Sequence, residues 1–473
     1  MGRGRFRQTT TLSFGLTAFI VGLASSRLVS FENAVVFVAL ICLLAPLLFC
    51  RNLLSLLSIS IIGILLGLFR GSVFLQSILP YGSLAKRPVT ITATATSDAV
   101  YGQRSQLTFD VGNISLEQPI KQKLVGTIGV GGFGQNMIYR GGKVRVQGKL
   151  YPTRGSRQAR ISFAQISVVE KGESGIDKVR RRFAAGLQSA VPEPLGSFGL
   201  GILIGQRTTL PDSLNDDLSI VGLTHVVAVS GYNLTIMVHL AQQLARKRSK
   251  YQSTILTLSF IGLFLVITGS SASIVRAAIV STLSLWAWCY GRKFKPILLI
   301  LIAAALTAGW FPLYLWSDIG WHLSFLAFFG VLYVAPEFQR RFLNNRKPRI
   351  ILQLVLETTA AQVMTLPLIM YIFGRLSLIS LLANMMVVPL IPIAMAASFV
   401  AGLAGMIIPA VSGWFSWPAT LLMTYMLDIV RLAAALPNAS VMQFMSVWQL
   451  VICYAIIALI LFTWRRKKAT IPS

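Results

Sequence analysis

The chain has 473 residues, of which 55% are hydrophobic and 12% charged, and its mean hydropathy is +0.69. This composition excludes an ordinary soluble globular protein and predicts a polytopic membrane protein, because several apolar runs approach the length that crosses a bilayer. The formal net charge of +28 exceeds what anchoring of cytoplasmic loops requires, so a polyanionic partner is expected, either a nucleic acid or an anionic lipid surface.

The N-terminal membrane region, residues 1–75, contains apolar runs at 12–24, 34–50 and 53–69, which predict three spans. Basic residues precede the first run and place the N-terminus in the cytoplasm. No small-residue cleavage site separates the runs, so they are not read as a signal peptide. Because three crossings bring the chain to the other side of the membrane, the next segment is expected to be extracytoplasmic.

Residues 86–170 change character, since the long apolar runs stop and polar and apolar residues alternate. Alternation bounded by Gly, Pro and Asn predicts half-buried strands. These strands are expected at 89–95, 106–111, 126–130, 143–150 and 159–166. A small β-barrel inserted between membrane regions is therefore predicted.

The predicted barrel is basic, with twelve Lys or Arg against four Asp or Glu, a net charge of +8. Small barrels of the OB type commonly bind single strands through a basic groove and stacking aromatic residues, which makes Tyr139 and Tyr151 candidate stacking platforms. The alternative is a solvated basic face near anionic lipid headgroups. The candidate basic contacts are Arg140, Lys143, Arg145, Lys149, Arg154, Arg157 and Arg160.

Residues 174–191 place an apolar stripe at spacings of three and four, with basic residues on the other faces. This pattern predicts an amphipathic helix that lies in the membrane interface. A larger helical domain is predicted at 195–465, and it begins with an apolar run at 197–205. Because that run is too short to cross alone, a re-entrant or lateral helix is expected there.

The segment 222–237 carries polar residues where a lipid-facing helix would carry Leu or Val. Polar groups in hydrocarbon need a partner or water, so these side chains are expected to line a cavity or the bundle interior. The candidates are His225, Ser230, Tyr232 and Asn233, together with Arg207 in the preceding loop.

Further spans follow this segment, with basic loops on alternate sides. Together with the first three they predict about twelve crossings, with both termini inside. The run at 376–408 is broken by prolines and is counted once. The spans are expected at 223–244, 251–268, 273–290, 296–312, 318–336, 351–373, 376–408, 413–436 and 446–464.

Three later polar clusters lie within apolar sequence. Arg276 enters a span opened by small residues, and it either faces a pore or extends to the outer interface. Asp318 and His322 stand four residues apart, either as a functional pair or as one that fixes two helices. Asn384 precedes Pro389 and Pro392, which either free backbone groups for a cavity or only kink the helix.

The segment 222–237 resembles the central motif of ComEC-type competence membrane proteins, which pass transforming DNA across the bacterial cytoplasmic membrane. The segment 140–152 is similar to the OB-like domain that this family carries between its early spans. The sequence departs from the family pattern at Gln206, where an acid is usual, and at Asn233, where many relatives have His. A cation-binding or ionisable role is therefore not carried over to these two positions. Other segments that resemble family motifs are 199–207, 269–278, 316–325, 365–374 and 383–392.

Full-length relatives usually carry a C-terminal metallo-β-lactamase-like domain, and this chain resembles a short form without it. The sequence has three histidines, no His-x-His-x-Asp-His run and no Gly-x-x-x-x-Gly-Lys-[Ser/Thr] phosphate loop. The four cysteines lie in or beside apolar runs and suggest neither disulfides nor zinc. No enzyme activity, metal or cofactor is therefore expected.

The resemblance implies a channel that passes single-stranded DNA across the cytoplasmic, or inner, membrane during natural transformation. The implied partners are single-stranded DNA, the bilayer, a separate nuclease, a DNA receptor and a cytoplasmic motor, with a homodimer as one assembly. The first alternative is a secondary transporter for a small anionic or lipid-like solute, which would also use broken helices and buried polar groups. The second is an intramembrane hydrolase that depends on Ser230 or His322.

Overall fold

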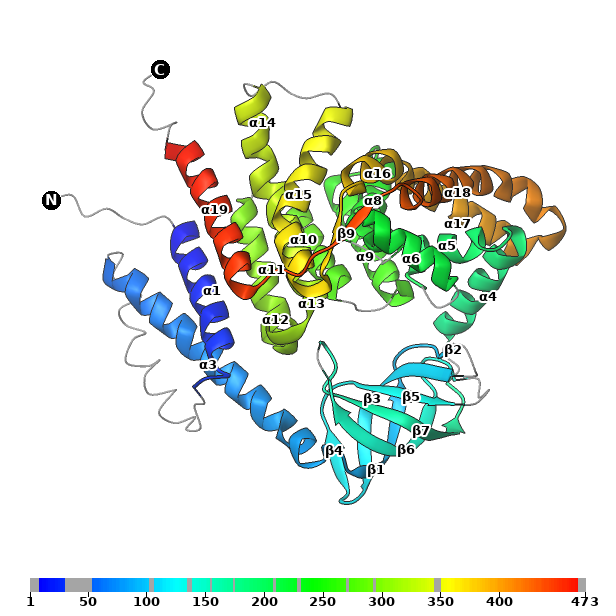
Figure 1. Cartoon of the computed structure of the whole chain (residues 1–473), viewed down its shortest axis with the longest axis horizontal. Coiled ribbons are helices and arrows are strands. Elements are labelled where there is room, and N and C mark those ends of the chain that lie inside the picture. The colour runs from blue at the N-terminus through cyan, green and yellow to red at the C-terminus, as the bar shows by residue number, and fades with distance from the viewer. Residues whose placement is uncertain are drawn as a thin grey trace. The chain divides into compact units, whose positions relative to one another are not determined.

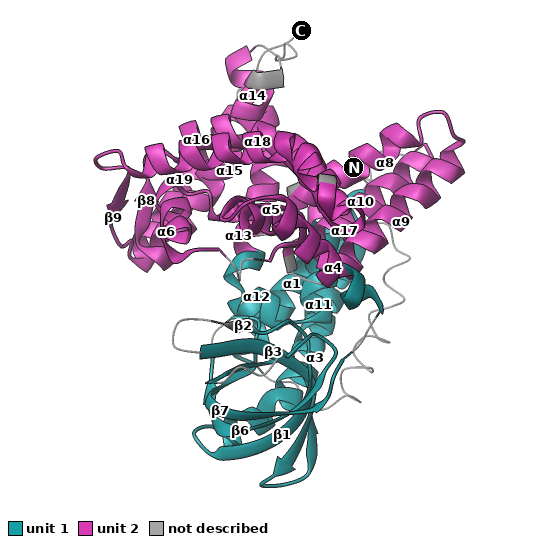
Figure 2. Cartoon of the chain, turned by 90° about the vertical axis from the view of Figure 1, so that its right-hand side faces the viewer, with its two compact units in different colours: residues 1–179, 301–321 teal, residues 180–300, 322–473 magenta. Residues whose placement is uncertain are grey.

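The structure is a computed structural model that describes residues 8–29, 53–101, 106–133, 138–153, 155–172, 175–206, 210–227, 231–268, 272–291, 295–343 and 350–466. It is mostly helical, with one small sheet domain near the N-terminus (Figure 1). The chain divides into two compact units, residues 1–179 with 301–321 and residues 180–300 with 322–473 (Figure 2). The fold class predicted from the sequence is confirmed: the chain is a helical membrane protein with an inserted barrel.

Five strands of the first unit form a closed ring in the order β1-β6-β7-β5-β3, and β3 pairs again with β1. All neighbours in the ring are antiparallel except β5 and β7, which are parallel. This is a small Greek-key barrel of the OB type, in which no ring strand leaves an open edge. The ring strands are β1 (Pro88–Ala95), β3 (Gln106–Gln118), β5 (Ile128–Phe133), β6 (Lys143–Pro152) and β7 (Ala159–Glu170), and the short strands β2 (Val100–Tyr101) and β4 (Gln122–Leu124) pair with β3.

The barrel forms because alternate residues of each strand point to opposite faces. On β6, Val144, Val146 and Leu150 are fully buried, while the intervening Lys and Arg residues are exposed. Tyr81 and Leu84 also belong to the barrel core, although they precede β1 in the chain. Burial of this apolar set contributes most of the stabilisation of the domain.

The helices of the first unit pack through small residues. An added Cβ at Gly67 would overlap the backbone of Phe19, so α1 (Gln8–Ser25) and α3 (Leu53–Ser83) are in backbone contact. Arg70 of α3 donates from Nε to the carbonyl oxygen of Gly309 at 2.8 Å and from Nη2 to that of Trp310 at 2.9 Å. These carbonyls end α11 (Pro296–Trp310), where a cation is favoured. The short α12 (Leu313–Ser317) follows.

The second unit has its largest core where α5 and α17 meet their neighbours. The last turns of α4 pack against α17, since a Cβ at Gly405 would overlap the carbonyl oxygen of Gly186. The apolar stripe predicted for the interface thus contacts protein at its C-terminal half. The helices of this core are α4 (Gly175–Ala190), α5 (Leu195–Ile204), α6 (Asp212–Val221), α7 (Thr224–Val227), α16 (Ser380–Val387), α17 (Ile391–Ile407) and α18 (Ser412–Ala434).

Further helices complete the second unit. Three of them, α8 (Gly231–Leu244), α9 (Lys250–Thr268) and α10 (Ala272–Cys289), share one apolar core. The others are α13 (Ile319–Phe329), the π-helical turn η3 (Gly330–Val334), α14 (Ala335–Leu343), α15 (Ile350–Phe373) and α19 (Val447–Arg466), and the strands β8 (Arg375–Ser377) and β9 (Ser440–Met442) pair as a small ribbon.

Within the described residues, six helical segments are long and apolar enough to cross a membrane. One of them, Ser380–Ile407, contains the predicted break, where the 3-10 turn η4 (Val388–Leu390) separates α16 from α17. The predicted span at 34–50 lies outside the described residues, so the total of about twelve crossings stays a prediction. The six segments are Leu53–Ser83, Lys250–Thr268, Ile319–Leu343, Leu352–Phe373, Ser380–Ile407 and Val447–Trp464.

Candidate functional site

The outward face of β6 carries three of the seven predicted basic contacts. Lys143, Arg145 and Lys149 alternate with buried residues and are exposed, and Tyr151 is 37% exposed at the end of the strand. In the sheet register Tyr151 lies opposite Arg160 of β7. The strand period alone therefore brings these four residues to one surface.

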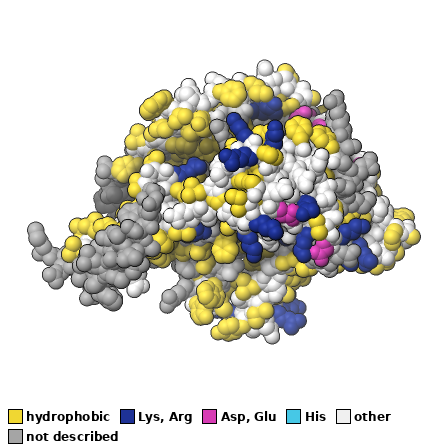
Figure 3. Space-filling model, turned by 90° about the horizontal axis from the view of Figure 1, so that it is seen from below, with side chains coloured by type: hydrophobic (Ala, Val, Ile, Leu, Met, Phe, Trp, Pro, Cys, Tyr) yellow, Lys and Arg dark blue, Asp and Glu magenta, His cyan; other side chains and the backbone are white. Residues whose placement is uncertain are grey.

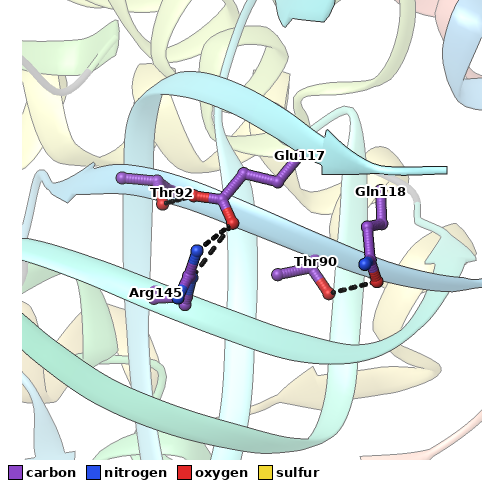
Figure 4. Close-up of polar contacts among 5 residues, drawn as sticks. All are labelled: Thr90, Thr92, Glu117, Gln118 and Arg145. Atoms are coloured by element: carbon purple, nitrogen blue, oxygen red, sulfur yellow. Dashed lines mark hydrogen bonds and ion pairs between the residues drawn. The ribbon is translucent and has the colours of Figure 1, made fainter. Parts of the chain in front are cut away.

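Two of the three basic residues on β6 are paired with carboxylates. Lys143 Nζ lies 2.6 Å from Glu170 Oε2, and Arg145 Nε donates to Glu117 Oε2 at 3.0 Å. Glu117 also accepts a hydrogen bond from the Thr92 hydroxyl at 2.6 Å (Figure 4). The Thr92 hydroxyl, and then the Arg145 guanidinium, hold the pKa of Glu117 below its usual value. Glu117 therefore forms an ion pair with Arg145.

A third predicted contact, Arg157, is paired in the same way. Its Nη2 donates to Asp110 Oδ2 at 3.0 Å, and its Nε lies 2.8 Å from Asp110 Oδ1. Burial raises the pKa of the Asp110 carboxyl, and the charge and hydrogen bond of Arg157 oppose that rise. Near Arg140 the Asp98 carboxylate accepts from the Arg140 backbone N–H at 2.9 Å.

Lys149 and Arg160 remain as exposed cations that form no ion pair within the described part of the barrel. The predicted contact Arg154 lies outside the described residues. Figure 3 shows the same local compensation on one face, where carboxylates lie against basic side chains. The basic surface is thus narrower than the composition of the domain suggests.

The structure also shows an exposed aromatic pair that the sequence reasoning missed. Phe133 and Phe163 are 54% and 78% exposed, and their ring centroids are 5.9 Å apart. Strict alternation from Ala159 and Ile161 would point Phe163 inward. The buried positions after it, however, change phase to Ala164. That phase change is the sequence signal for an extra residue in the strand.

In the segment 222–237, the described polar residues bind nearby backbone. The ring Nδ1 of His225 lies 3.2 Å from the carbonyl oxygen of Gly222, and Asn233 Nδ2 donates to the carbonyl oxygen of Ile202 at 2.8 Å. Asn233 is 1% exposed, so it fixes α8 against α5. Ser230, Arg207 and the side chain of Tyr232 lie outside the described residues, and their roles stay predictions.

Arg276 of α10 is 7% exposed, although α10 is apolar. Its Nη1 donates to the Ser324 hydroxyl, and its guanidinium lies 5.4 Å and 5.6 Å from the ring centroids of Phe325 and Phe328. Its Nη2 would lie 2.9 Å from a Cβ added at Gly231. Arg276 therefore meets the first residue of α8, within the segment 222–237.

The remaining predicted residues are not brought together with Arg276 by any described contact. Asp318 Oδ1 accepts from the backbone N–H of Trp321 at 2.8 Å and so caps the start of α13. Asp318 belongs to the first compact unit and His322 to the second, and their pairing stays a prediction. Asn384 is 7% exposed, and its Oδ1 has no hydrogen-bond partner among the described residues.

The described residues contain no group of three or more His, Cys, Asp or Glu side chains that could hold a metal ion. The side chains described at the barrel surface and around Arg276 offer electrostatic attraction, hydrogen bonding and aromatic stacking. On the barrel these act at an exposed surface, and at Arg276 they act inside the apolar bundle.

Comparison with known proteins adds independent evidence. A family model described as "Competence protein" matches residues 202–467. The curated protein "ComE operon protein 3" of Bacillus subtilis (strain 168) is 25% identical over 262 residues, which cover 54% of this chain and 33% of that protein. The match thus spans about a third of the relative's length. No solved structure matches this chain.

Proposed function

Because this chain belongs to the competence protein family, we propose that it is a membrane channel that passes single-stranded DNA across the bacterial cytoplasmic membrane during DNA uptake. In this proposal the N-terminus is cytoplasmic, and the barrel is extracytoplasmic and receives the strand. A separate nuclease, a DNA receptor and a cytoplasmic motor supply strand degradation, capture and movement.

The observation that carries the proposal is the environment of Arg276. A guanidinium is expensive to bury in an apolar bundle unless an anion accompanies it. The described neighbours of Arg276 are one hydroxyl and two aromatic rings, which do not neutralise its charge. A transported polyanion would supply the missing negative charge one phosphate at a time.

The position of Arg276 strengthens this reading. Its Nη2 lies at Gly231, where α8 begins, and the first backbone N–H groups of a helix have no partner within the helix. Both the guanidinium and the helix start favour an anion at the same place. Phosphate contacts of this kind do not depend on base sequence, which suits a channel for arbitrary DNA.

The test is uptake by the purified chain in proteoliposomes, in which an inside-positive membrane potential drives the anionic strand in place of the motor. Uptake is measured as labelled single-stranded DNA that becomes protected from an added nuclease. Arg276→Gln keeps an N–H donor on a long side chain and removes its charge. We expect it to lower the rate of uptake at least tenfold, because a charge-assisted contact in a site of low dielectric contributes roughly 1.5–3 kcal/mol.

The matched control is Arg431→Gln, which removes an exposed arginine of α18 that pairs with Asp428 at 3.8 Å. It should leave uptake unchanged. If Arg276→Gln takes up DNA at the wild-type rate, the proposed role of Arg276 is wrong. Absence of DNA uptake by the wild-type chain, with saturable uptake of a small organic anion instead, would favour the transporter alternative.

A further inference from the structure

A β-bulge in β7 turns Phe163 out of the barrel. The register of β7 against β6 passes from Lys149↔Ser162 to Gln147↔Gln165, so β7 has one residue more than its partner in this interval. The parallel pairing with β5 shifts at the same place, between Val130 and Gly132. Bulges commonly re-aim one side chain, and here that side chain is Phe163.

The backbone of Phe163 is strained. Its φ is +55°, in the left-handed region that bulky side chains rarely adopt. The ring is 78% exposed, so burial of this side chain does not compensate the strain. Backbone strain of this kind concentrates at functional sites.

Two neighbouring glycines make room for the bulge. A Cβ at Gly132 of β5 would lie 2.5 Å from the carbonyl oxygen of Ala164, and a Cβ at Gly148 of β6 would lie 2.6 Å from Ile161 Cγ2. Both contacts are closer than real Cβ atoms tolerate. The strands on both sides of β7 are therefore built to accept the outward Phe163.

The exposed ring has Phe133 of β5 as an aromatic neighbour, and a cation reaches the same strand two residues before Phe133. The rings of Phe133 and Phe163 are tilted by 32° with centroids 5.9 Å apart. A base held between them would need about 7 Å, twice the ~3.5 Å van der Waals separation. The open face of Phe163 is therefore the stacking surface. Arg160 lies over the bare backbone of Gly131, with Nη2 3.5 Å from where a Cβ would stand.

We infer that Phe163, backed by Phe133 and flanked by Arg160, is a stacking site for one base of a single DNA strand, with Arg160 contacting the adjacent phosphate. This inference rests on the proposed function, because it names where the barrel receives its substrate. Exposed aromatic rings beside cations are the means by which OB folds hold single strands without sequence preference.

The observations favour a nucleic acid over a protein partner. Each of β5 and β7 pairs on both sides, so a peptide cannot add a strand at this place. Two rings also offer far less area than the roughly 800 Å² per partner of a stable protein interface. A flat ring with a neighbouring guanidinium matches the size and the charge of one nucleotide.

The test uses the full chain in nanodiscs of neutral phosphatidylcholine and two fluorescein-labelled strands of about 12 nucleotides, within the ~4–16 nucleotides that one OB fold covers. One strand is oligothymidylate, and the other has the same phosphates without bases. Phe163→Leu keeps an apolar side chain and removes the ring, while Phe163→Trp enlarges the ring. Arg160→Gln removes the charge alone.

We expect Phe163→Leu to weaken oligothymidylate binding about tenfold, equivalent to ~1.4 kcal/mol, and to change binding of the abasic strand by less than about twofold. Phe163→Trp should bind oligothymidylate at least as tightly as the wild type. Arg160→Gln should weaken both strands by the same factor. Since these side chains are exposed, unchanged circular dichroism is expected for all three variants.

Wild-type affinity of Phe163→Leu for oligothymidylate would overturn the stacking site and leave the proposed channel function standing. An equal loss of both strands would also overturn it, because the ring would then act on the phosphate contacts. If the wild-type chain binds neither strand, the barrel is not a DNA receiver, and both this inference and that part of the proposed function fail.

Discussion

The ion pairs on the barrel lead to a prediction about how DNA binding depends on salt. Each phosphate that a protein neutralises on a single strand changes the slope of log K against log salt by about −0.7. Arg145 is already neutralised by Glu117, whereas Lys149 and Arg160 form no ion pair among the described residues. Of these three residues, only Lys149 and Arg160 should therefore contribute to the slope.

Two double variants separate these groups. Lys149→Gln with Arg160→Gln removes two unpaired charges and should reduce the magnitude of the slope by about 1.4, twice the single-contact value. Arg145→Gln with Glu117→Gln removes one ion pair and leaves the net charge unchanged, so its slope should stay within about 0.2 of the wild type. Single removal of Arg145 would be a poor probe, because it would leave Glu117 to repel the strand.

The assay is fluorescence anisotropy of a labelled single strand with the full chain in neutral nanodiscs, over a salt series from about 50 to 200 mM. If the magnitude of the slope were about 0.7 smaller in the Arg145 and Glu117 double variant than in the wild type, the reasoning would be refuted. It would mean that phosphate displaces Glu117 and that exposed ion pairs do not reduce the effective charge of this face.

Three other changes test the packing, the strain and the acid pairing. Gly405→Ala should destabilise the chain by roughly 1–3 kcal/mol, because its Cβ would overlap the backbone of Gly186. The control is Gly262→Ala, whose Cβ would meet no atom within 4 Å and which should not destabilise the chain. Thermal unfolding in detergent measures both. Phe163→Asn should raise the unfolding temperature, because asparagine tolerates the positive φ that costs phenylalanine about 1–2 kcal/mol, and an unchanged or lower value would count against strain at this residue. Glu117→Gln should be less stable than the wild type at neutral pH. Since the folded pKa of Glu117 is lowered, this difference should shrink as the pH falls below the ordinary glutamate pKa of about 4.3 and through the folded pKa; a constant difference in a pH series of thermal melts would contradict the pairing.

The strands of the barrel were predictable because alternation is a local property. The outward polar and inward apolar residues of 143–150 follow directly from the period of a strand. The ion pairs were not predictable, since Arg145 meets Glu117 through two separate sheet pairings that join β6 to β1 and β1 to β3. The sequence of one strand gives its number of charged residues, but it does not show which charged residues of other strands lie opposite them.

Phe163 shows how one residue can reverse a local prediction. A strict period of two assigns it to the core, and the register shift places it on the surface. The shift depends on Gly132 and Gly148, which lie on two other strands. The environment of Arg276 was beyond prediction for the same reason, because its hydroxyl and aromatic contacts lie 48 to 52 residues further along the chain.

The acids of the barrel bear on how the strand is released. Three of the four form ion pairs with predicted DNA contacts, so three of the seven predicted basic contacts are neutralised locally. A face with six to ten free phosphate contacts would change affinity by about 10³–10⁵ between 50 and 200 mM salt and would hold the strand tightly in dilute medium. A site that holds one stacked base and one or two phosphates binds the strand more weakly, and its affinity depends less on salt. Because a receiver must pass each nucleotide onward, weak and sequence-independent contact at Phe163 is consistent with transport, whereas a fully exposed basic groove would favour retention.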